Sequence, residues 1–205
     1  MVVTDITRTQ RGRYSIFLDD EFFAALHIDV YVASGIKIDD NVTEQQMLDL
    51  KAQSEGKITR DRAYKLLSVK SYSRNKLIEK LLKYGEPEIC EQTADKMEEY
   101  GLINDYDYSM ALARDMYNLK GFSARKIFYE LMKKGIEKEM SKEASEQFDD
   151  DLDKERIAAV LEKRVRKSLT DRKERTRITT YLVRMGYSFE DINFAIRDYI
   201  ENEDE

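Results

Sequence analysis

The same helix ending occurs three times in this chain at a regular spacing. The segments are Leu81–Gly85, Leu131–Gly135 and Leu182–Gly186, each with two apolar residues, a basic residue, one further residue and a glycine. The three glycines are 50 and 51 residues apart. Similarity at a fixed period of this size indicates a tandem array of small helical units. Such arrays usually bind extended partners along one surface, so the pattern favours a binding protein over an enzyme with a buried pocket.

The composition agrees with a helical chain in a reducing compartment. The 205 residues include one proline and eight glycines, which leaves little loop-forming sequence. We find no apolar run of membrane-spanning length and no signal peptide at the N-terminus, and Cys90 cannot form an internal disulfide. We therefore expect a cytoplasmic protein. The net charge of −6 argues mildly against naked DNA as the main partner.

The first part of the chain differs from the rest. Residues 2–28 alternate apolar and polar residues around Asp19-Asp20, which predicts a β-hairpin that lacks the usual turn glycine. Thr43 with Gln46 forms a capping-box pattern that starts a helix, expected to end at Ala52 or Gln53. Gly56 then closes this N-terminal region.

Three units of three short helices are predicted after Gly56. Ser73, Ser123 and Ser188 are expected helix N-caps, Pro87 suits a first helical turn, and glycines end several helices. The predicted fold is mostly α: an elongated, curved tandem array of three three-helix repeats behind a small β-hairpin and helix region. The predicted divisions are 1–56 for the N-terminal region and 57–103, 104–150 and 151–205 for the repeats.

An ordered set of short segments supports a family resemblance that covers essentially the whole chain. The segments are Gly35–Lys37, Ser73–Gly85, Tyr100–Asp105, Lys120-Gly121, Lys134–Ile136 and Met185–Ser188. Together they resemble the RecX family, bacterial regulators of the RecA recombinase. One departure is Lys120-Gly121-Phe122, where the family often has a second small residue, which puts the local turn geometry in question.

The resemblance implies a helical-repeat protein of DNA repair, homologous recombination and the SOS response, and we expect it to be a monomer because one copy can bridge two RecA protomers. It implies binding to the RecA filament on single-stranded DNA, in the helical groove, with contacts to single-stranded or duplex DNA made directly or through RecA. It implies modulation, mostly inhibition, of ATP hydrolysis, strand exchange and co-protease activity. It implies no catalytic residues, and we also expect no cofactor and, from the missing apolar run, no membrane partner.

A basic segment in the third repeat is the first candidate binding site. Between Lys154 and Arg184 there are eleven basic and four acidic residues, and such density attracts phosphates or an acidic protein surface. The alternative is an ordinary solvated turn between two helices. The candidate residues are Lys163, Arg164, Arg166, Lys167, Arg172, Lys173, Arg175 and Arg177.

A second candidate is a set of cations at the start of each repeat's middle helix. Its members are Arg74, Lys76, Arg125, Lys126, Arg175 and Arg177. If the repeats stack regularly, these cations form a ladder along one side of the array. We favour the alternative that they are an exposed surface carried along by repeat duplication.

The remaining candidate groups favour structural interpretations. His27 has no second ligand for a metal, and Cys90 is expected to be a buried apolar residue without an activating base. Asp149–Asp151 and Asp153 lack the spacing of a calcium loop and suit a solvated linker. The alternative function is a helical module that binds DNA directly, without RecA. An enzyme such as a nuclease is disfavoured, because no carboxylate–lysine cluster on an α/β core is apparent.

Overall fold

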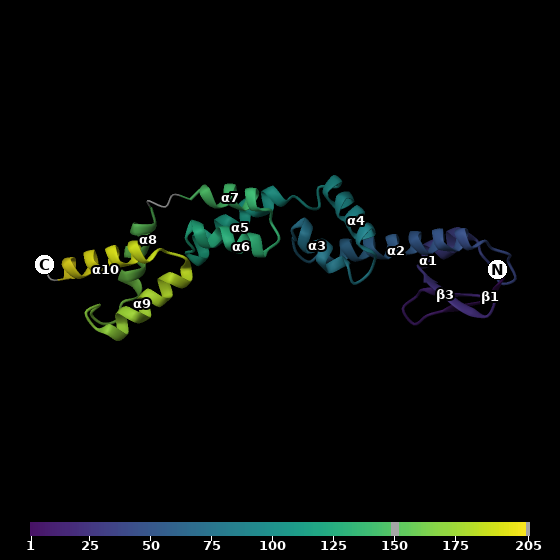
Figure 1. The fold of residues 1–205 in the computed structure, drawn as a ribbon, viewed down its shortest axis with the longest axis horizontal. Coiled ribbons are helices and arrows are strands. Elements are labelled where there is room, and N and C mark those ends of the chain that lie inside the picture. The colour runs from purple at the N-terminus through teal and green to yellow at the C-terminus, as the bar shows by residue number, and fades with distance from the viewer. Residues whose placement is uncertain (149–151, 204–205) are drawn as a thin grey trace. The chain divides into compact units, whose positions relative to one another are not determined.

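The computed structural model describes residues 1–148 and 152–203, which form two compact units, Met1–Asn104 and Asp105–Glu205. Apart from an N-terminal sheet, the described chain is built of helices, which confirms the predicted fold class (Figure 1). The Asp149–Asp151 part of the acidic run lies outside the described residues. In the first unit the elements are β1 (Val3–Arg8), β2 (Tyr14–Leu18), β3 (Glu21–Leu26), α1 (Ile28–Ser34), α2 (Glu44–Leu67), α3 (Arg74–Leu81) and α4 (Pro87–Glu99). In the second they are α5 (Asp105–Lys120), α6 (Ala124–Lys133), α7 (Lys138–Glu146), α8 (Leu152–Arg164), α9 (Arg172–Met185) and α10 (Phe189–Glu203).

The N-terminal sheet is a meander of three antiparallel strands in the order β1-β2-β3. The β2–β3 turn is formed by Asp19 and Asp20, whose φ angles are 49° and 67°. A two-residue hairpin turn of this kind needs positive φ at both positions, and aspartate tolerates it better than most residues. The Asp19 carboxylate accepts a hydrogen bond from the Val2 backbone N–H at 2.8 Å, which helps to hold the turn.

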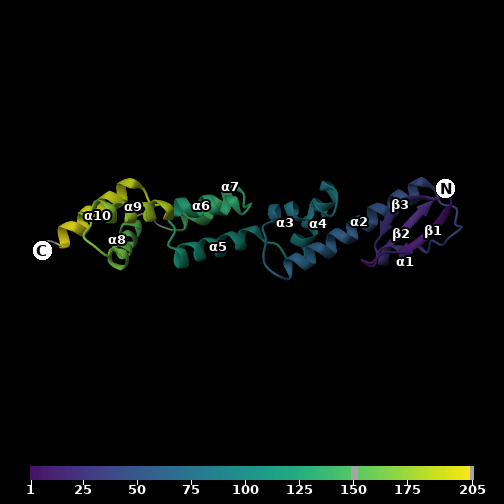
Figure 2. The same ribbon diagram turned by 90° about the horizontal axis from the view of Figure 1, so that it is seen from below.

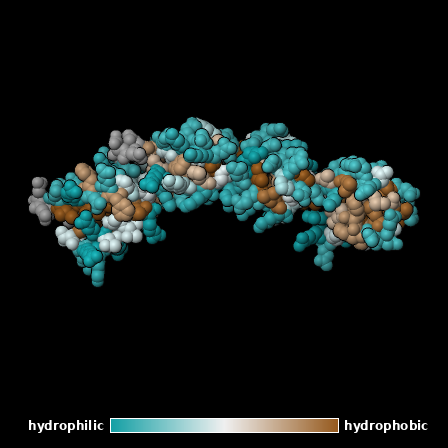
Figure 3. All heavy atoms as spheres, in the orientation of Figure 1, coloured by the Kyte–Doolittle hydropathy of each residue, from teal (hydrophilic) through white to brown (hydrophobic). Residues whose placement is uncertain are grey.

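One face of the sheet packs on the start of α2, as both views of the ribbon show (Figures 1 and 2). The buried residues of this cluster are Val3, Ile16, Leu18, Ala24, Leu26 and Met47. Hydrophobic residues also gather on the visible outer surface of the sheet region in Figure 3, and Phe22 is 59% exposed. Packing against α2 gives the sheet the apolar support that an isolated hairpin lacks in water.

The predicted helix end at Ala52 or Gln53 is wrong, because α2 has 24 residues and runs from Glu44 to Leu67. The Thr43–Gln46 capping box is present, as expected. Gly56 lies buried inside the helix, although glycine in a helix interior costs about 1 kcal/mol relative to alanine. The nearby Ser54 hydroxyl accepts a hydrogen bond from the His27 backbone N–H at 2.7 Å, so small residues here allow the chain before α1 to approach. Tertiary packing therefore outweighs the helix-breaking tendency of glycine.

Each group of three helices has its own buried apolar cluster. Leu77, Leu81 and Met97 anchor the cluster of α2, α3 and α4. In the second unit one cluster joins α5, α6 and α7, and another joins α8, α9 and α10. The Ser73 and Ser123 side chains cap α3 and α6, and Ser188 accepts from the Asp191 backbone N–H at the start of α10, all as predicted.

The glycines that follow the three middle helices do not share one role. Gly135 and Gly186 have φ angles of 84° and 98°, the left-handed conformation expected after a helix end. Gly85 is absent from the positive-φ positions of the described residues, and a Cβ there would lie 2.5 Å from the Thr59 hydroxyl oxygen. The repeated glycine is therefore required by backbone conformation at two sites and by close packing against α2 at the third.

Gly186 joins the third repeat to the second. The Ser123 backbone N–H, just before α6, donates to the Met185 carbonyl at the end of α9, with an N···O distance of 3.0 Å. A Cβ on Gly186 would lie 2.5 Å from the Ser123 hydroxyl oxygen and would overlap Lys126. The end of one middle helix therefore rests on the cap of the preceding one, at a distance that only glycine permits.

Tyr187 and Arg156 extend the same junction. The buried Tyr187 hydroxyl donates to the Gly121 carbonyl at 3.0 Å, and the Arg156 guanidinium donates to the Tyr117 carbonyl at 2.6 Å. The guanidinium also lies 3.6 Å from the centre of the Tyr117 ring. Burial raises the pKa of the Tyr187 phenol, so this hydroxyl remains a donor at neutral pH.

The substitution Gly186→Ala tests this junction. The added methyl group meets Ser123 and Lys126 and forces alanine into a left-handed conformation, so we expect a loss of about 2–4 kcal/mol in unfolding free energy. Gly121→Ala is the matched control in the same unit, because its φ is +67° and the nearest atom lies 3.9 Å away. It should lose about 1 kcal/mol. Urea unfolding followed by circular dichroism measures both, and equal losses would contradict the close contact at Gly186.

Candidate partner-binding surface

The basic segment predicted from the sequence folds into a turn between two helices of the third repeat. It comprises the end of α8, the loop 165–171 and the first two turns of α9. Six exposed cations of this segment form no ion pair among the described residues, and together we call them the α8–α9 basic surface. They are Lys163, Arg166, Lys167, Arg172, Lys173 and Arg175.

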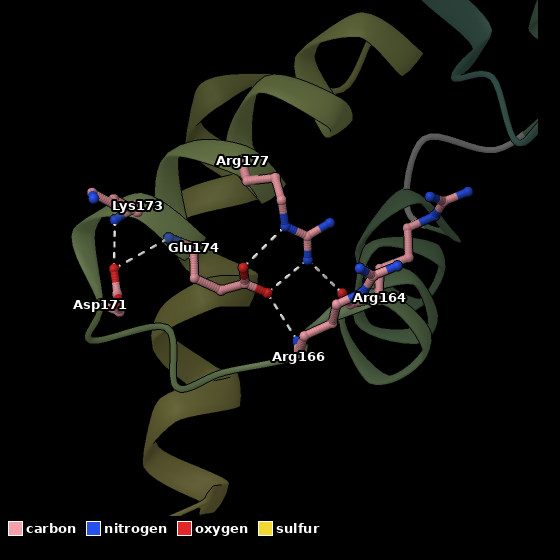
Figure 4. A network of polar contacts seen from close by, with 6 residues as sticks. All are labelled: Arg164, Arg166, Asp171, Lys173, Glu174 and Arg177. Atoms are coloured by element: carbon pink, nitrogen blue, oxygen red, sulfur yellow. Dashed lines mark hydrogen bonds and ion pairs between the residues drawn. The ribbon is translucent and has the colours of Figure 1, made fainter.

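A buried carboxylate organises this turn (Figure 4). Glu174, on the first turn of α9, is 8% exposed and accepts two hydrogen bonds from Arg177, at 3.0 Å from Nε and 2.6 Å from a terminal nitrogen. It also accepts the Arg166 backbone N–H at 2.8 Å. The same terminal nitrogen of Arg177 donates to the Arg164 carbonyl at the end of α8, at 2.6 Å. Glu174 and Arg177 thereby tie the loop to both helices.

The environment of Glu174 favours its ionised form strongly. The hydrogen bond from Arg177, followed by that from the Arg166 backbone, lowers the pKa of Glu174 from 4.5 to about 2. Asp171 caps α9 by accepting the backbone N–H groups of Lys173 and Glu174, and Leu169 is completely buried. The loop is therefore fixed at both ends and in the middle.

The structure separates the eight residues of the first candidate set into two groups. Arg177 is paired with Glu174, and the Arg164 guanidinium lies 4.1 Å from the centre of the Tyr181 ring. Arg164 and Arg177 therefore contact other residues of the third repeat. The other six residues form the α8–α9 basic surface. Since Glu174 is turned inward against Arg177, its charge does little to neutralise these six cations.

The second candidate set is largely neutralised. Arg74 pairs with Asp95 and Glu98, Lys76 pairs with Glu79, and Lys126 pairs with Glu130 at 3.2 Å. Arg125 is exposed. In the third repeat the helix begins earlier than in the other two, so Arg175 and Arg177 lie at the fourth and sixth residues of α9. Arg74 and Lys76 belong to one compact unit and Arg125 and Lys126 to the other, and each pair starts its own middle helix.

Other sequence candidates have structural surroundings. The His27 imidazole accepts the Asp29 backbone N–H at 3.1 Å and caps α1, a helix that the sequence analysis did not predict. Cys90 is completely buried, and burial raises the pKa of its thiol. Within the described ranges, no group of three histidine, cysteine or acidic side chains could hold a metal ion. No helix of those ranges is long and apolar enough to cross a membrane.

Sequence reasoning missed two features of charge. One is that Glu174 binds Arg177 and the loop backbone, whereas the sequence shows only an acidic residue within a basic segment. The other is a basic cleft in the first unit, lined by Arg8, Arg11, Arg13, Arg62 and Lys65. These cations come from two separate stretches of chain, so no local pattern brings them together.

The substitution Glu174→Gln tests how the basic turn is held. It removes the charge that Arg177 and the Arg166 backbone recognise, so we expect the Arg166 amide to exchange its hydrogen about 10-fold faster at pH 7. Because the pKa of Glu174 is lowered in the folded chain, its contribution is present above pH 4.5 and is lost as the pH falls towards 2. The variant and the wild type should therefore converge in acid.

Glu162→Gln, an exposed position on α8, is the matched control and should leave the Arg166 amide unchanged. Hydrogen exchange followed by nuclear magnetic resonance makes the comparison. An Arg166 amide that exchanges equally in the wild type and both variants at pH 7 would show that Glu174 does not hold the loop.

The second and third repeats each match a described domain of one protein family. Residues 104–144 match the family described as RecX, second three-helix domain, and residues 151–196 match RecX, third three-helix domain. Among curated proteins, Regulatory protein RecX of Caldanaerobacter subterraneus subsp. tengcongensis is 28% identical over 199 residues, covering 96% of this chain and 98% of that protein. Regulatory protein RecX of Bacillus subtilis is 29% identical over 210 residues, covering 99% and 78%.

Solved structures share the fold. A crystal structure of regulatory protein RecX superposes with a TM-score of 0.63 at 20% identity, covering 98% of both chains. The crystal structure of RecX from Lactobacillus salivarius gives a TM-score of 0.60 at 24% identity, covering 72% of this chain and 97% of that one. Domain matches in the second and third repeats and relatives aligned over nearly the full length confirm the resemblance of this chain to the RecX family.

Proposed function

We propose that this protein binds the RecA filament on single-stranded DNA and lowers RecA's ATP hydrolysis, strand exchange and co-protease activity. Similarity over nearly the full length to curated proteins named regulatory proteins supports a regulatory role. The observation that carries the proposal is the α8–α9 basic surface, whose six cations have no ion-pair partner among the described residues. A filament of protein and DNA presents phosphates and acidic side chains along one groove, and both attract such a surface.

The proposed mechanism is occupancy of the filament. One monomer in the cytoplasm lies in the groove, contacts neighbouring RecA subunits and blocks the approach of duplex DNA or of protein substrates. ATP hydrolysis falls because it takes place at the contacts between RecA subunits. The exposed cations lie at the surface rather than in an apolar pocket, so their attraction is screened by salt and acts mainly on the rate of association.

The alternative function is direct binding of DNA without RecA. The α8–α9 basic surface also favours this alternative, since its cations would attract the phosphates of free DNA. The net charge of −6 argues mildly against free DNA as the main partner, although a local basic surface can still bind it. Inhibition of RecA at protein concentrations far below those that bind free DNA would support the filament proposal over direct binding.

The double substitution Arg166→Glu with Lys167→Glu tests the surface. Both side chains are exposed, so we expect the fold to persist while the concentration for half-inhibition of RecA ATP hydrolysis rises on the order of 10-fold. Lys51→Glu with Lys138→Glu changes the net charge equally at exposed positions on α2 and α7 and should inhibit like the wild type. Single-stranded-DNA-dependent ATP hydrolysis at low and moderate salt is the assay.

Two results would count against these conclusions. Equal loss of inhibition in both double variants would mean that net charge, and not this surface, decides binding. If the folded wild-type protein failed to inhibit at any ratio to RecA, even at low salt, the regulatory proposal itself would be wrong.

A further inference from the structure

A cleft between the β1–β2 turn and the second half of α2 gathers positive charge in the first unit. Its volume is about 610 Å³, and its lining includes Arg8, Arg11 and Arg13 around the turn and Arg62 and Lys65 on α2. The sheet lies beside α2 in the ribbon views (Figures 1 and 2). Within residues 1–148 and 152–203, none of these five side chains takes part in a salt bridge.

The carboxylate at the cleft pairs with side chains other than these five cations. Asp61 is the acidic residue of the lining, and its two oxygens lie 3.3 Å from the Lys57 ammonium and 3.3 Å from His27 Nε2. These contacts hold Asp61 against the chain before α1. The charge of the five cations is therefore not compensated from within the lining of the cleft.

Arg62 shows the cost of this arrangement most clearly. Its guanidinium carbon lies 4.9 Å from the centre of the Tyr84 ring, and its Nε is buried with no hydrogen-bond partner in the described chain. A buried donor without an acceptor is unfavourable, and an anion beside this half-buried guanidinium would be attracted by its charge. Arginine also suits phosphate, because its planar fork can donate two parallel hydrogen bonds to two oxygens.

We propose that this cleft binds the phosphate backbone of single-stranded nucleic acid. Several cations that converge from a turn and a helix suit a polymer whose negative charges are closely spaced. Tyr84, which is 37% exposed, lines the same cleft, and the ring face that Arg62 does not cover is an aromatic surface on which an unpaired base can stack. The bases of a duplex are already paired and stacked, so the aromatic group favours a single strand. The inference does not depend on RecA binding.

Fluorescence anisotropy with a labelled oligothymidylate of about 20 nucleotides, without RecA, tests the cleft. Arg11→Ser with Lys65→Ser removes two exposed cations, and we expect about 10-fold weaker binding at low salt. The slope of log affinity against log salt should fall by about 1.4, at about 0.7 for each lost phosphate contact. Tyr84→Leu should weaken binding by about 5-fold through lost stacking.

Lys37→Ser with Lys51→Ser is the control, because it removes the same charge from exposed positions of the same unit that do not line the cleft. It should bind like the wild type. Since the α8–α9 basic surface can also attract phosphates, the comparison between the two double variants assigns the site. Circular dichroism verifies that each variant is folded.

Several results would overturn the proposal. The proposed site would be wrong if the wild type did not bind the oligothymidylate at low salt. It would also be wrong if the two double variants bound it with equal affinity. Unchanged affinity of Tyr84→Leu, or tighter binding of a duplex of equal length, would overturn the single-strand assignment. Competition by polyglutamate as effective as that by unlabelled oligothymidylate would instead indicate an acidic protein partner.

Discussion

The contact between Gly186 and the cap of α6 is the constraint on which the architecture of the second unit depends. A repeat of three short helices buries only a small apolar cluster, so the array needs specific contacts between neighbouring repeats. Here Gly186, in the left-handed conformation that ends α9, lies against Ser123 and Lys126, and the Tyr187 hydroxyl donates to the Gly121 carbonyl. One backbone conformation therefore ends α9 and positions the third repeat on the second.

In both units a carboxylate pairs with groups of its own unit while neighbouring cations stay without an ion-pair partner among the described residues. Within the α8–α9 turn the single buried carboxylate, Glu174, is used internally to hold Arg177 and the loop backbone, while the six cations around it remain exposed. In the first unit Asp61 is likewise held by Lys57 and His27, beside a cleft of five cations. Both units of an acidic protein thus present local positive surfaces. Binding at such surfaces is strong at low salt and specific only where the partner matches their spacing.

Sequence reasoning succeeded where the signal is local. The caps formed by Thr43, Ser73 and Ser123 and the left-handed conformation of Gly135 and Gly186 depend on a few neighbouring residues, and the sequence indicates them directly. The 50-residue spacing likewise revealed the repeats. Local reasoning failed at Gly56, because burial against the chain before α1 keeps the helix intact where the sequence suggests an end. It also did not anticipate α1 or the inward turn of Glu174, which depend on contacts between separate segments.

A hydrogen-exchange footprint on the RecA filament tests the central claim most directly. The protein is mixed with RecA on single-stranded DNA, with RecA alone and with the DNA alone, and exchange is compared along the chain. The account predicts that the filament slows exchange in the loop 165–171 and at the start of α9 beyond any change caused by either component alone. Unchanged exchange in these segments, with filaments formed and the protein in excess, would contradict it.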